Sequence, residues 1–315
     1  MSRKVWSCGL ACLLALAAPV RSQPPHTAHY PSWAFPLKVE KLLPPEGSQP
    51  KTLPGSTRSY TQEQIDDLLN PPDWFPDRRP DPPAIILKGR GDALACGACH
   101  LMSGLGHPES ADLTGLSVNY MVQQMKDFRT GSRIDVPRMN KIAAAVSEEE
   151  SLAAAQWFAR LTPRPFTRVV EAHTVPRTFV GDGRMRYMEP GGGTEPIGDR
   201  IITIPEDPVR ARLRDPYSGF IAYVPPGSIA KGRALAQTGG GRTVPCALCH
   251  GTDLKGAGDV PRLAGVHPIY IARQLYRFRD RTRNGAAAAA MRPSVERLTD
   301  EDIVNLSAYL GSLAP

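Results

Sequence analysis

The alternation of hydrophobic and polar residues along the chain favours helices, and the clearest helical patterns occur in pairs. Residues 120–128 carry apolar side chains at helical spacing, and residues 270–279 repeat residues 120–129 with Tyr, Gln, Phe and Arg in register. Each is followed by a helix N-cap signal, Ser147 with Glu150 in the first copy and a matching Thr299 in the second. An internal repeat of this kind predicts two helical units built on one plan.

The segment before the first unit has a different pattern. Residues 23–83 hold 14 of the 32 prolines, which predicts an extended arm without a core of its own. One short helix is expected between Ser59 and Pro71, with an apolar face that includes Ile65. Large aromatic residues either form a docking arm for a partner or fix the arm to the helical units, and we favour the second because exposed aromatics are uncommon. These aromatics are Trp33, Phe35, Trp74 and Phe75.

The segment between the two units, residues 163–227, is rich in Gly and Pro. Residues 200–204 and 220–224 are apolar and β-branched, which predicts short strands. The triple glycine at 191–193 lacks the lysine of a phosphate-binding loop, so it is interpreted as a turn. The connection is either a small β insert or a strap across both helical units, and the sequence leaves both open.

Each helical unit contains one copy of a five-residue motif, Cys96-Gly97-Ala98-Cys99-His100 and Cys246-Ala247-Leu248-Cys249-His250. The pattern Cys-x-x-Cys-His is the signature of covalent c-type haem attachment. Thiols three positions apart lie on one side of a helical turn, where they can add to the two vinyl groups of one haem. The adjacent His then supplies an axial nitrogen to the iron. The sequence therefore predicts two covalently bound haem c groups.

Other uses of paired cysteines fit the spacing less well. A zinc ribbon needs its two pairs about 15–20 residues apart, whereas Cys99 and Cys246 are separated by most of the chain. A thioredoxin-like site needs a βαβ context, which the flanking sequence does not show. Two structural disulfides would not explain a His at the same offset in both copies. Cys8 and Cys12 fall in the predicted leader, so the mature chain has no cysteines left for a disulfide framework.

A six-coordinate haem needs a second axial ligand, and two methionines occupy matching positions. Met139 lies 39 residues after His100 and Met291 lies 41 after His250, each eight residues before its capping signal. The predicted iron ligands are therefore His100 with Met139 and His250 with Met291. An isolated Met is more often core filler, and three others remain core residues or substitute ligands in the first unit, namely Met102, Met121 and Met125. His107, His173 and His267 are interpreted as surface or core histidines.

Residues 1–22 have the features of a secretory signal, with Arg3 and Lys4 before the apolar stretch 5–20. Cleavage is expected between Ala17 and Ser22, which predicts a periplasmic protein, and an uncleaved membrane anchor is the alternative. The segment carries three basic and no acidic residues, so the chain without it has a net charge of +4 rather than +7. This weak charge and the scattered arginines argue against nucleic-acid binding.

With these motifs assembled, the second unit resembles the class I cytochromes c of the dihaem cytochrome c4 type. The matching runs are Cys246–Gly251, 261–265 (Pro-Arg-Leu-Ala-Gly), the Tyr270-to-Phe278 helix, Met291, and residues 298–310. The resemblance covers residues 228–315 well and 84–162 moderately. It implies a mainly α fold of two class I cytochrome c domains in tandem, with His/Met-ligated iron and electron transfer. The expected organisation is a signal peptide (1–22), a Pro-rich arm (23–83), cytochrome c domain 1 (84–162), a connection with short strands (163–227) and cytochrome c domain 2 (228–315).

The first unit departs from the family pattern because residues 110–115 replace the Pro261-Arg262-Leu263-Ala264-Gly265 run. In the family, the carbonyl of that Pro accepts the proton on the second nitrogen of the ligand His, and such bonds tune ligand basicity. Ala111 can offer the same carbonyl with a less fixed geometry. The first haem is therefore expected to differ in potential from the second.

The leading hypothesis is an electron carrier without enzymatic activity, which relays electrons between redox partner proteins. The expected partners are a donor dehydrogenase or membrane complex and an acceptor oxidase or reductase, with membrane association through partners as an option. The alternative is a dihaem enzyme, a peroxidase or small-molecule dehydrogenase, which needs an open or displaceable axial position. A third hypothesis is an electron-entry subunit held permanently on its partner. The register-matched methionines argue against the enzyme.

Overall fold

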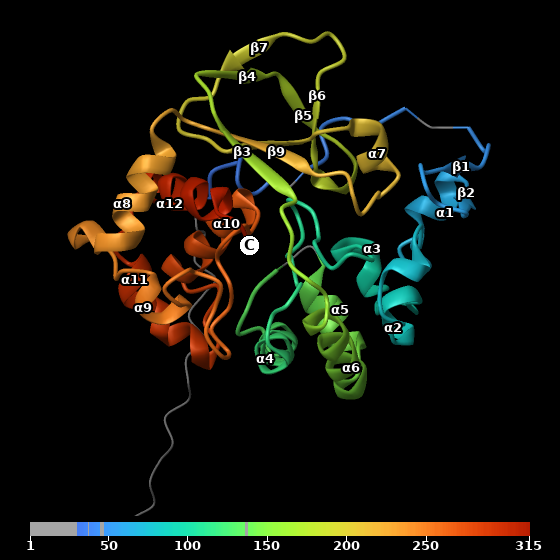
Figure 1. The fold of residues 1–315 in the computed structure, drawn as a ribbon, viewed down its shortest axis with the longest axis horizontal. Helices are drawn as coiled ribbons and strands as arrows, with labels where there is room; N and C mark the ends of the chain where they lie inside the picture. The colour runs from blue at the N-terminus through green and yellow to red at the C-terminus, as the bar shows by residue number, and fades with distance from the viewer. Residues whose placement is uncertain (1–29, 37, 45–46, 136–137) are drawn as a thin grey trace, which may run out of the picture.

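The computed structural model describes residues 30–36, 38–44, 47–135 and 138–315, so the predicted leader and its cleavage region lie outside the described residues. Two helical units lie side by side below a layer of short strands (Figure 1). The expected fold class is confirmed: the chain is mainly α, with tandem cytochrome c-like units, an N-terminal arm and a connection that carries short strands. No helix in the described part of the chain is long and apolar enough to cross a membrane.

The first unit surrounds the first motif. Its helices are α2 (Ala84–Leu87), α3 (Cys96–His100), α4 (Val118–Arg129), α5 (Met139–Ala145) and α6 (Glu148–Ala159). The Ser117 side chain caps α4 by accepting the Tyr120 N–H at 3.0 Å, which fixes where this helix begins. Ser147 and Glu150 form the predicted capping box at the start of α6. Trp157 on α6 is fully buried in the core of this unit.

The second unit repeats this arrangement with a longer first helix, since α8 has 11 residues and α2 has 4. It contains α8 (Ser228–Thr238), α9 (Ala247–His250), α10 (Pro268–Arg279), the 3₁₀ segment η4 (Ala286–Met291), α11 (Arg292–Val295) and α12 (Asp300–Ser312). Thr299 and Asp302 form the capping box of α12. Helices α8 and α12 meet at Gly232, where an added Cβ would lie 1.9 Å from the Asn305 carbonyl oxygen. Only glycine permits so close an approach, so this residue sets the distance between the two helices.

The repeat is less regular in conformation than in sequence. The run Lys231-Gly232-Arg233 lies inside α8, whereas the matching Lys88-Gly89-Arg90 lies beyond the end of α2. The arm takes the place of the missing turns: Gly89 N–H donates to the Leu69 carbonyl at 2.7 Å, and Ala95 N–H to the Leu68 carbonyl at 3.1 Å. The N-terminal helix of the first unit therefore stops early because its backbone groups pair with the arm.

The arm is more ordered than its proline content predicts. It contains the antiparallel pair β1 (Lys51–Thr52) and β2 (Ser59–Tyr60), the helix α1 (Gln62–Asp66) and the 3₁₀ segment η1 (Pro76–Arg78). The predicted short helix is present as α1, which begins after a Thr61 capping box. The expectation of no core is wrong in one respect. Trp74, Leu53 and Ile65 form a small buried cluster with Leu213 of the connection.

The arm aromatics fix it in place, as favoured above, but not all to the helical units. Trp33 and Phe35 pack edge to face on Tyr276 of α10, in the second unit. Trp74 instead reaches the connection, where its Nε1–H donates to the Leu213 carbonyl at 2.8 Å. The arm therefore joins the second unit and the connection, and it covers the first unit through backbone pairing.

The connection contains nine short elements. They are β3 (Thr167–Glu171), β4 (Thr174–Pro176), β5 (Thr178–Val180), η2 (Asp182–Arg184), β6 (Arg186–Met188), β7 (Thr194–Pro196), β8 (Ile202–Pro205), α7 (Pro208–Arg212) and β9 (Phe220–Val224). A three-stranded sheet has the order β3-β9-β8, with β3 parallel and β8 antiparallel to β9. The pairs β4–β7 and β5–β6 are antiparallel.

Both interpretations of the connection hold at once. It is a small β insert, and it also spans the two helical units above their joint (Figure 1). Phe166 and Phe220 pack on Leu101 and Leu105 of the first unit. On the other side, Ala222 and its neighbours on β9 belong to the core of the second unit. The connection therefore holds the two units in one arrangement.

Candidate functional site

The two motifs place their histidines in the same hydrogen-bonded frame. His100 Nδ1 lies 2.8 Å from the Ala111 carbonyl oxygen, and His250 Nδ1 lies 2.8 Å from the Pro261 carbonyl oxygen. A carbonyl can only accept, so Nδ1 carries the proton in both rings and Nε2 keeps its lone pair. Burial lowers the pKa of both histidines, which favours the neutral ring that a metal ligand requires.

The Ala111 carbonyl lies as close to its histidine as the Pro261 carbonyl does. Each histidine carbonyl accepts the N–H of a glycine six residues later, Gly106 or Gly256, at 2.9 Å. An added Cβ at Gly106 would lie 2.5 Å from the Ala111 carbonyl oxygen, so the loop is closely packed there. The two histidine frames therefore have the same geometry in this structure. A less fixed Ala111 carbonyl and a difference in potential both stay predictions.

None of the four motif cysteines forms a disulfide. Burial raises the pKa of Cys96 to about 12 and that of Cys246 to about 11, and it also raises the pKa of Cys99. High pKa values disfavour the thiolate that a zinc site requires. In the described ranges, no group of three or more His, Cys, Asp or Glu side chains could hold a metal ion.

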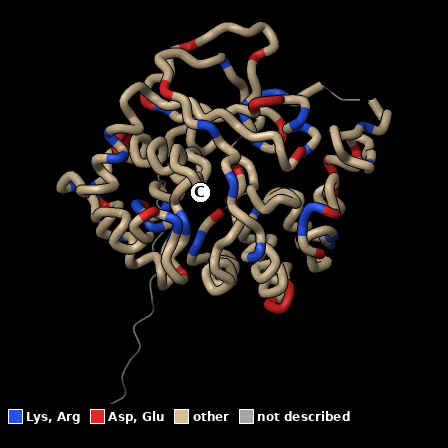
Figure 2. The backbone as a smooth tube through the Cα atoms, in the orientation of Figure 1, with Lys and Arg blue, Asp and Glu red and all other residues tan. Residues whose placement is uncertain are grey.

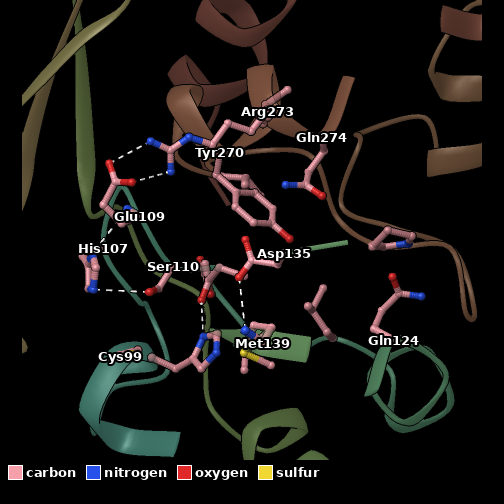
Figure 3. A pocket seen from close by; sticks show the side chains of 18 of the residues that line it. Cys99, His107, Glu109, Ser110, Gln124, Asp135, Met139, Tyr270, Arg273 and Gln274 are labelled. Atoms are coloured by element: carbon pink, nitrogen blue, oxygen red, sulfur yellow. Dashed lines mark hydrogen bonds and ion pairs between the residues drawn. The ribbon is translucent and has the colours of Figure 1, made fainter. Parts of the chain in front are cut away.

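A single cavity of about 960 Å³ is lined by both motifs, with Cys96, Cys99 and His100 at one site and Cys246, Cys249 and His250 at the other. Its volume is at the upper end of the range of roughly 300–1,000 Å³ for ligand and cofactor sites. Met139, the first residue of α5, and Met291, the last of η4, both line it. Figure 3 shows Met139 and Cys99 at this pocket.

The other methionines of the first unit divide into two groups. Met121 and Met125 on α4 also line the cavity, so they remain substitutes for Met139. Met102 does not line it and packs on Gly97, where its Cε would lie 2.6 Å from an added Cβ. The assignment of Met139 and Met291 as iron ligands therefore stays a prediction. Besides Met291, the methionines that line the cavity are Met121, Met125 and Met139 of the first unit and Met185 of the connection.

Two buried arginines, one from each unit, form a cluster where the units meet. Arg133 Nη2 donates to the Tyr270 hydroxyl at 2.9 Å, and Arg283 Nη2 donates to the Tyr120 hydroxyl at 2.8 Å. Gln124 and Gln274, which occupy matching positions in the repeat, complete the cluster. Each side-chain oxygen accepts a hydrogen bond from both guanidinium groups. Sequence reasoning matched the Tyr and Gln residues but missed the arginines. Their equal spacing, thirteen residues after each Tyr, was the signal.

This cluster tests whether the site fits a haem. In the part of the chain that the structure describes, no carboxylate lies within ion-pair distance of Arg133 or Arg283. The buried Nε of Arg133 also has no hydrogen-bond partner. Two buried cations without anions are unfavourable unless a ligand supplies the charge. A haem carries two carboxylates, so these residues fit haem groups bound in the cavity, with Arg133 and Arg283 holding their carboxylates.

Ion pairs also cross between the units. Asp112 and Arg262 are 2.7 Å apart and almost fully buried, at 4% and 5% exposure of their side chains. Glu109 and Arg273 pair at 2.7 Å, as Figure 3 shows. Elsewhere the charges of both signs are interspersed rather than gathered on one face (Figure 2).

Of the described histidines outside the motifs, His267 lies at the joint, His107 lines the cavity and His173 is on the surface. His267 is buried, and its Nε2 donates to the Leu105 carbonyl at 2.9 Å while its Nδ1 accepts the Thr167 hydroxyl at 2.6 Å. It therefore joins the second unit to the first unit and the connection. His107 is half-buried and its ring lies 3.3 Å from the Ser110 hydroxyl. His173 is exposed on the connection.

The two motifs differ most in what covers them. Ala98, between the cysteines of the first motif, is 1% exposed, whereas its counterpart Leu248 is 73% exposed. Arg214 of the connection donates from Nη1 to the Ala98 carbonyl and closes over the first motif. Cys99 is half-buried and Cys249 is exposed. The first site is thus enclosed, and the second opens to the surface beside its motif.

Comparison with known proteins adds to this picture. A family model described as cytochrome c matches residues 229–314. The chain is similar to cytochrome c4 of Stutzerimonas stutzeri, with 26% identity over 234 residues that cover 71% of this chain and 87% of that protein. It is also similar to cytochrome c-554(548) of Halomonas halodenitrificans, with 37% identity over 78 residues that cover 24% of this chain and 94% of that protein. A protein of Stutzerimonas stutzeri named thiosulfate dehydrogenase electron acceptor is 26% identical over 225 residues, covering 70% of this chain and 80% of that protein.

Proposed function

The chain belongs to the dihaem c-type cytochromes related to cytochrome c4 and carries covalently bound haem c, and on that premise we propose that it relays single electrons between periplasmic redox proteins. The observation that carries the proposal is the single cavity lined by both motifs and both register-matched methionines. When bound, each haem supplies an iron that cycles between the ferric and ferrous states.

In this proposal the motif cysteines Cys96, Cys99, Cys246 and Cys249 hold the haem covalently. His100 and His250 supply neutral Nε2 lone pairs, because their Nδ1 protons are engaged by the Ala111 and Pro261 carbonyls. Met139 and Met291 supply thioether sulfur, a soft ligand that favours the ferrous state and raises the potential.

The protein also provides charge and exclusion of water. Arg133 and Arg283 balance the haem carboxylates at the joint, where the low polarity of the surroundings strengthens each interaction. The apolar residues of α4 and α6, such as Phe128 and Phe158, line the first site and keep water from it. These residues are expected to act by holding the haem in place, and none of them needs to react.

Periplasmic location and partner identity belong to the proposal. The leader-like residues 1–22 support export, and covalent attachment of c-type haem takes place outside the bacterial cytoplasmic membrane. A similar protein is named as the electron acceptor of a thiosulfate dehydrogenase, which supports a dehydrogenase as the donor. The acceptor is proposed to be an oxidase or reductase.

We place the contact with partner proteins at the second motif. Leu248 is 73% exposed beside the exposed Cys249, so a partner can approach this motif directly. The first motif lies under Arg214 and the arm, which leaves no comparable surface there. Partners would therefore exchange electrons at the second site, and the first site would be reached through the joint.

The optical spectrum of the holoprotein tests the proposal. We expect two low-spin haems, a Met–iron charge-transfer band in the ferric state, and no shift of the ferrous spectrum with carbon monoxide. A high-spin ferric component or a rapid carbon monoxide shift would mean that one axial position is open. The enzyme hypothesis would then replace the carrier, with the enclosed first site as its active site.

A substitution tests where partners dock. Leu248→Glu is expected to slow electron exchange with a small soluble c-type cytochrome by roughly tenfold, the effect of about 1.4 kcal/mol at an interface. Reduction by ascorbate should be unchanged, because a small molecule needs no docking surface. Val209→Glu is the matched control, since Val209 is 70% exposed on α7 of the connection. Equal slowing by both variants would contradict docking at the second motif.

A further inference from the structure

The cavity extends beyond the first motif into a region that the repeat does not have. The connection contributes Arg184, Tyr187 and Arg214 to its lining. Arg214 lies close enough to both Cys99 and Tyr187 for their charges to interact. We call this part the connection recess. Nothing at the second motif corresponds to it, because that motif opens to the surface beside Leu248.

Arg214 is the residue that closes the recess. It adopts a left-handed backbone conformation with φ of +55°, and Arg184 does the same with φ of +62°. Such conformations are uncommon for residues other than glycine and often mark functional sites. The Arg214 Nη1 donates to the Ala98 carbonyl, which places the guanidinium beside the two cysteines of the first motif.

Neither recess arginine has a balancing carboxylate. Asp215, the neighbour of Arg214, pairs instead with Arg210 at 2.6 Å. In the described residues no acidic side chain lies within ion-pair distance of Arg214 or Arg184. Asp66 and Asp182 also line the cavity, and Asp66 acts on Arg214 through space without forming an ion pair. Burial lowers the pKa of Arg214, as expected for a cation without a partner.

The unused hydrogen-bond donors open onto the recess. Among the described residues, the side-chain nitrogen and oxygen atoms that are fully buried and lack a hydrogen-bond partner belong to Arg133, Thr203, Arg262 and Tyr276. The Arg214 side chain makes one hydrogen bond and the Tyr187 hydroxyl makes none. Neither side chain has an atom among those that are fully buried without a partner. Their remaining donors are therefore accessible from the cavity. Burial raises the pKa of Tyr187 to about 12, so its hydroxyl keeps its proton near neutral pH.

A haem carboxylate is the wrong partner for Arg214. In the haem molecule the two vinyl groups and the two carboxylates lie on opposite edges, and Arg214 contacts the motif whose cysteines bind the vinyl edge. The buried cations available to the carboxylates are Arg133 and Arg283 at the joint. Asp66 and Asp182 line the cavity but form no ion pair with Arg214 or Arg184, so an anion from solution can supply the direct partner that these guanidinium groups lack.

We propose that the connection recess binds a small anion, an inorganic oxyanion or a small carboxylate, through the guanidinium groups of Arg214 and Arg184 with the Tyr187 hydroxyl as a further donor. The planar guanidinium suits oxygen anions because it offers two parallel donors. The recess is enclosed by the connection, so its ligand is a small molecule and not a side chain of a partner protein. Anion binding itself does not depend on the proposed electron transfer. The inference rests on the proposed function only where the midpoint potentials of the haems are measured.

Isothermal titration of the oxidised holoprotein with sulfate, phosphate, thiosulfate and acetate, at constant ionic strength in chloride, tests the proposal. We expect saturable binding of at least one of these probes. Preference for acetate would identify a carboxylate ligand, and preference for one of the other three an inorganic oxyanion. Absence of saturable binding by all four probes at millimolar concentrations would overturn the proposal.

Variants locate the site. Arg214→Gln removes the charge and is expected to weaken binding at least about tenfold, whereas Arg214→Lys should weaken it less because it keeps the charge. Arg168→Gln is the control, since Arg168 is exposed on β3 and does not line the cavity. If Arg214→Gln fails to fold or to retain two haems, Arg184→Gln and Tyr187→Phe decide. Unchanged binding in those two variants, or an equal loss in the control, would contradict the assignment.

The midpoint potentials give an independent second readout. An anion beside the first motif should stabilise ferric iron there, lowering one midpoint by about 59 mV for each tenfold preference for the oxidised protein and leaving the other unchanged. Saturable binding that shifts neither midpoint would remove this coupling to electron transfer. The binding constants themselves do not depend on electron exchange, so failure of the proposed function and failure of this inference can be told apart.

Discussion

The two helical units share one motif chemistry and differ in their surroundings. In the second unit an eleven-residue helix, α8, packs on α12 through Gly232, and the motif opens to solvent at Leu248. In the first unit α2 has four residues, and the arm and the connection cover the motif in place of the missing turns. The iron ligands can thus be kept the same while access to the site is changed by segments outside the repeat.

The comparison separates two ways to set the properties of a haem site. The frame around each histidine is the same, with Nδ1 at 2.8 Å from a carbonyl oxygen in both units. What differs is burial, the charge of Arg214 beside the first motif, and exposure of the second. Differences in potential or partner access between the two sites should therefore follow the covering segments and not the ligand frame.

Removal of the methionine ligands is the strongest test of the shared plan. Met139→Leu and Met291→Leu should each convert one haem to a high-spin form and lower its midpoint by on the order of 100 mV or more, within the roughly 0.8 V range that axial ligands span. Spectroelectrochemistry measures both changes. Met102→Leu is the control, because Met102 is buried outside the cavity. If Met139→Leu left the first haem low-spin, Met121 or Met125 would be its ligand.

The joint between the units should be sensitive to acid. Burial lowers the pKa of His267, so the unfolded chain binds more protons than the folded chain between the folded pKa and about 6.5. Stability should then fall as the pH drops below 6.5, by up to about 1.4 kcal/mol per pH unit for this residue.

Thermal unfolding of the holoprotein between neutral pH and pH 5 measures this loss. His267→Gln should reduce the slope, since glutamine does not titrate and can still donate to Leu105 and accept from Thr167. The matched control is His173→Gln, at an exposed position of the connection. The same slope in wild type and His267→Gln would show that the joint does not depend on a neutral His267.

The smallest effect is expected from the residue that first set the units apart in sequence. Ala111→Pro gives the first unit the proline of the second, and because the His100 frame is already formed, the first midpoint should move by less than about 30 mV, about threefold in an equilibrium constant. Redox titration of both haems measures it, with Pro261→Ala as the reverse change. A larger shift would show that a difference in potential between the units arises from the carbonyl that accepts from the ligand histidine.

Much of this comparison could be predicted from the sequence because it depends on local patterns. The motif spacing, the Ser147 and Thr299 capping boxes and the Tyr-to-Phe helices all follow from residues a few positions apart. The enclosure of the first motif could not be predicted, since Arg214 reaches Ala98 across more than a hundred residues. The Trp74 cluster was missed for the same reason, because it needs Leu213 of the connection to form.

The parallel pairing of β3 and β9 makes the connection a detour in the path of the chain. Phe220 N–H donates to the Phe166 carbonyl at 2.9 Å, and Ala172 N–H donates to the Val224 carbonyl at 3.0 Å. The chain therefore leaves the first unit along β3 and returns beside it along β9, in the same direction. A chain that passed directly from 166 to 220 would reach the second unit along the same course. The link between the two units and the cover over the first motif are therefore separable. The segment between 166 and 220 could be exchanged by evolution or by design while the chain still links the two units.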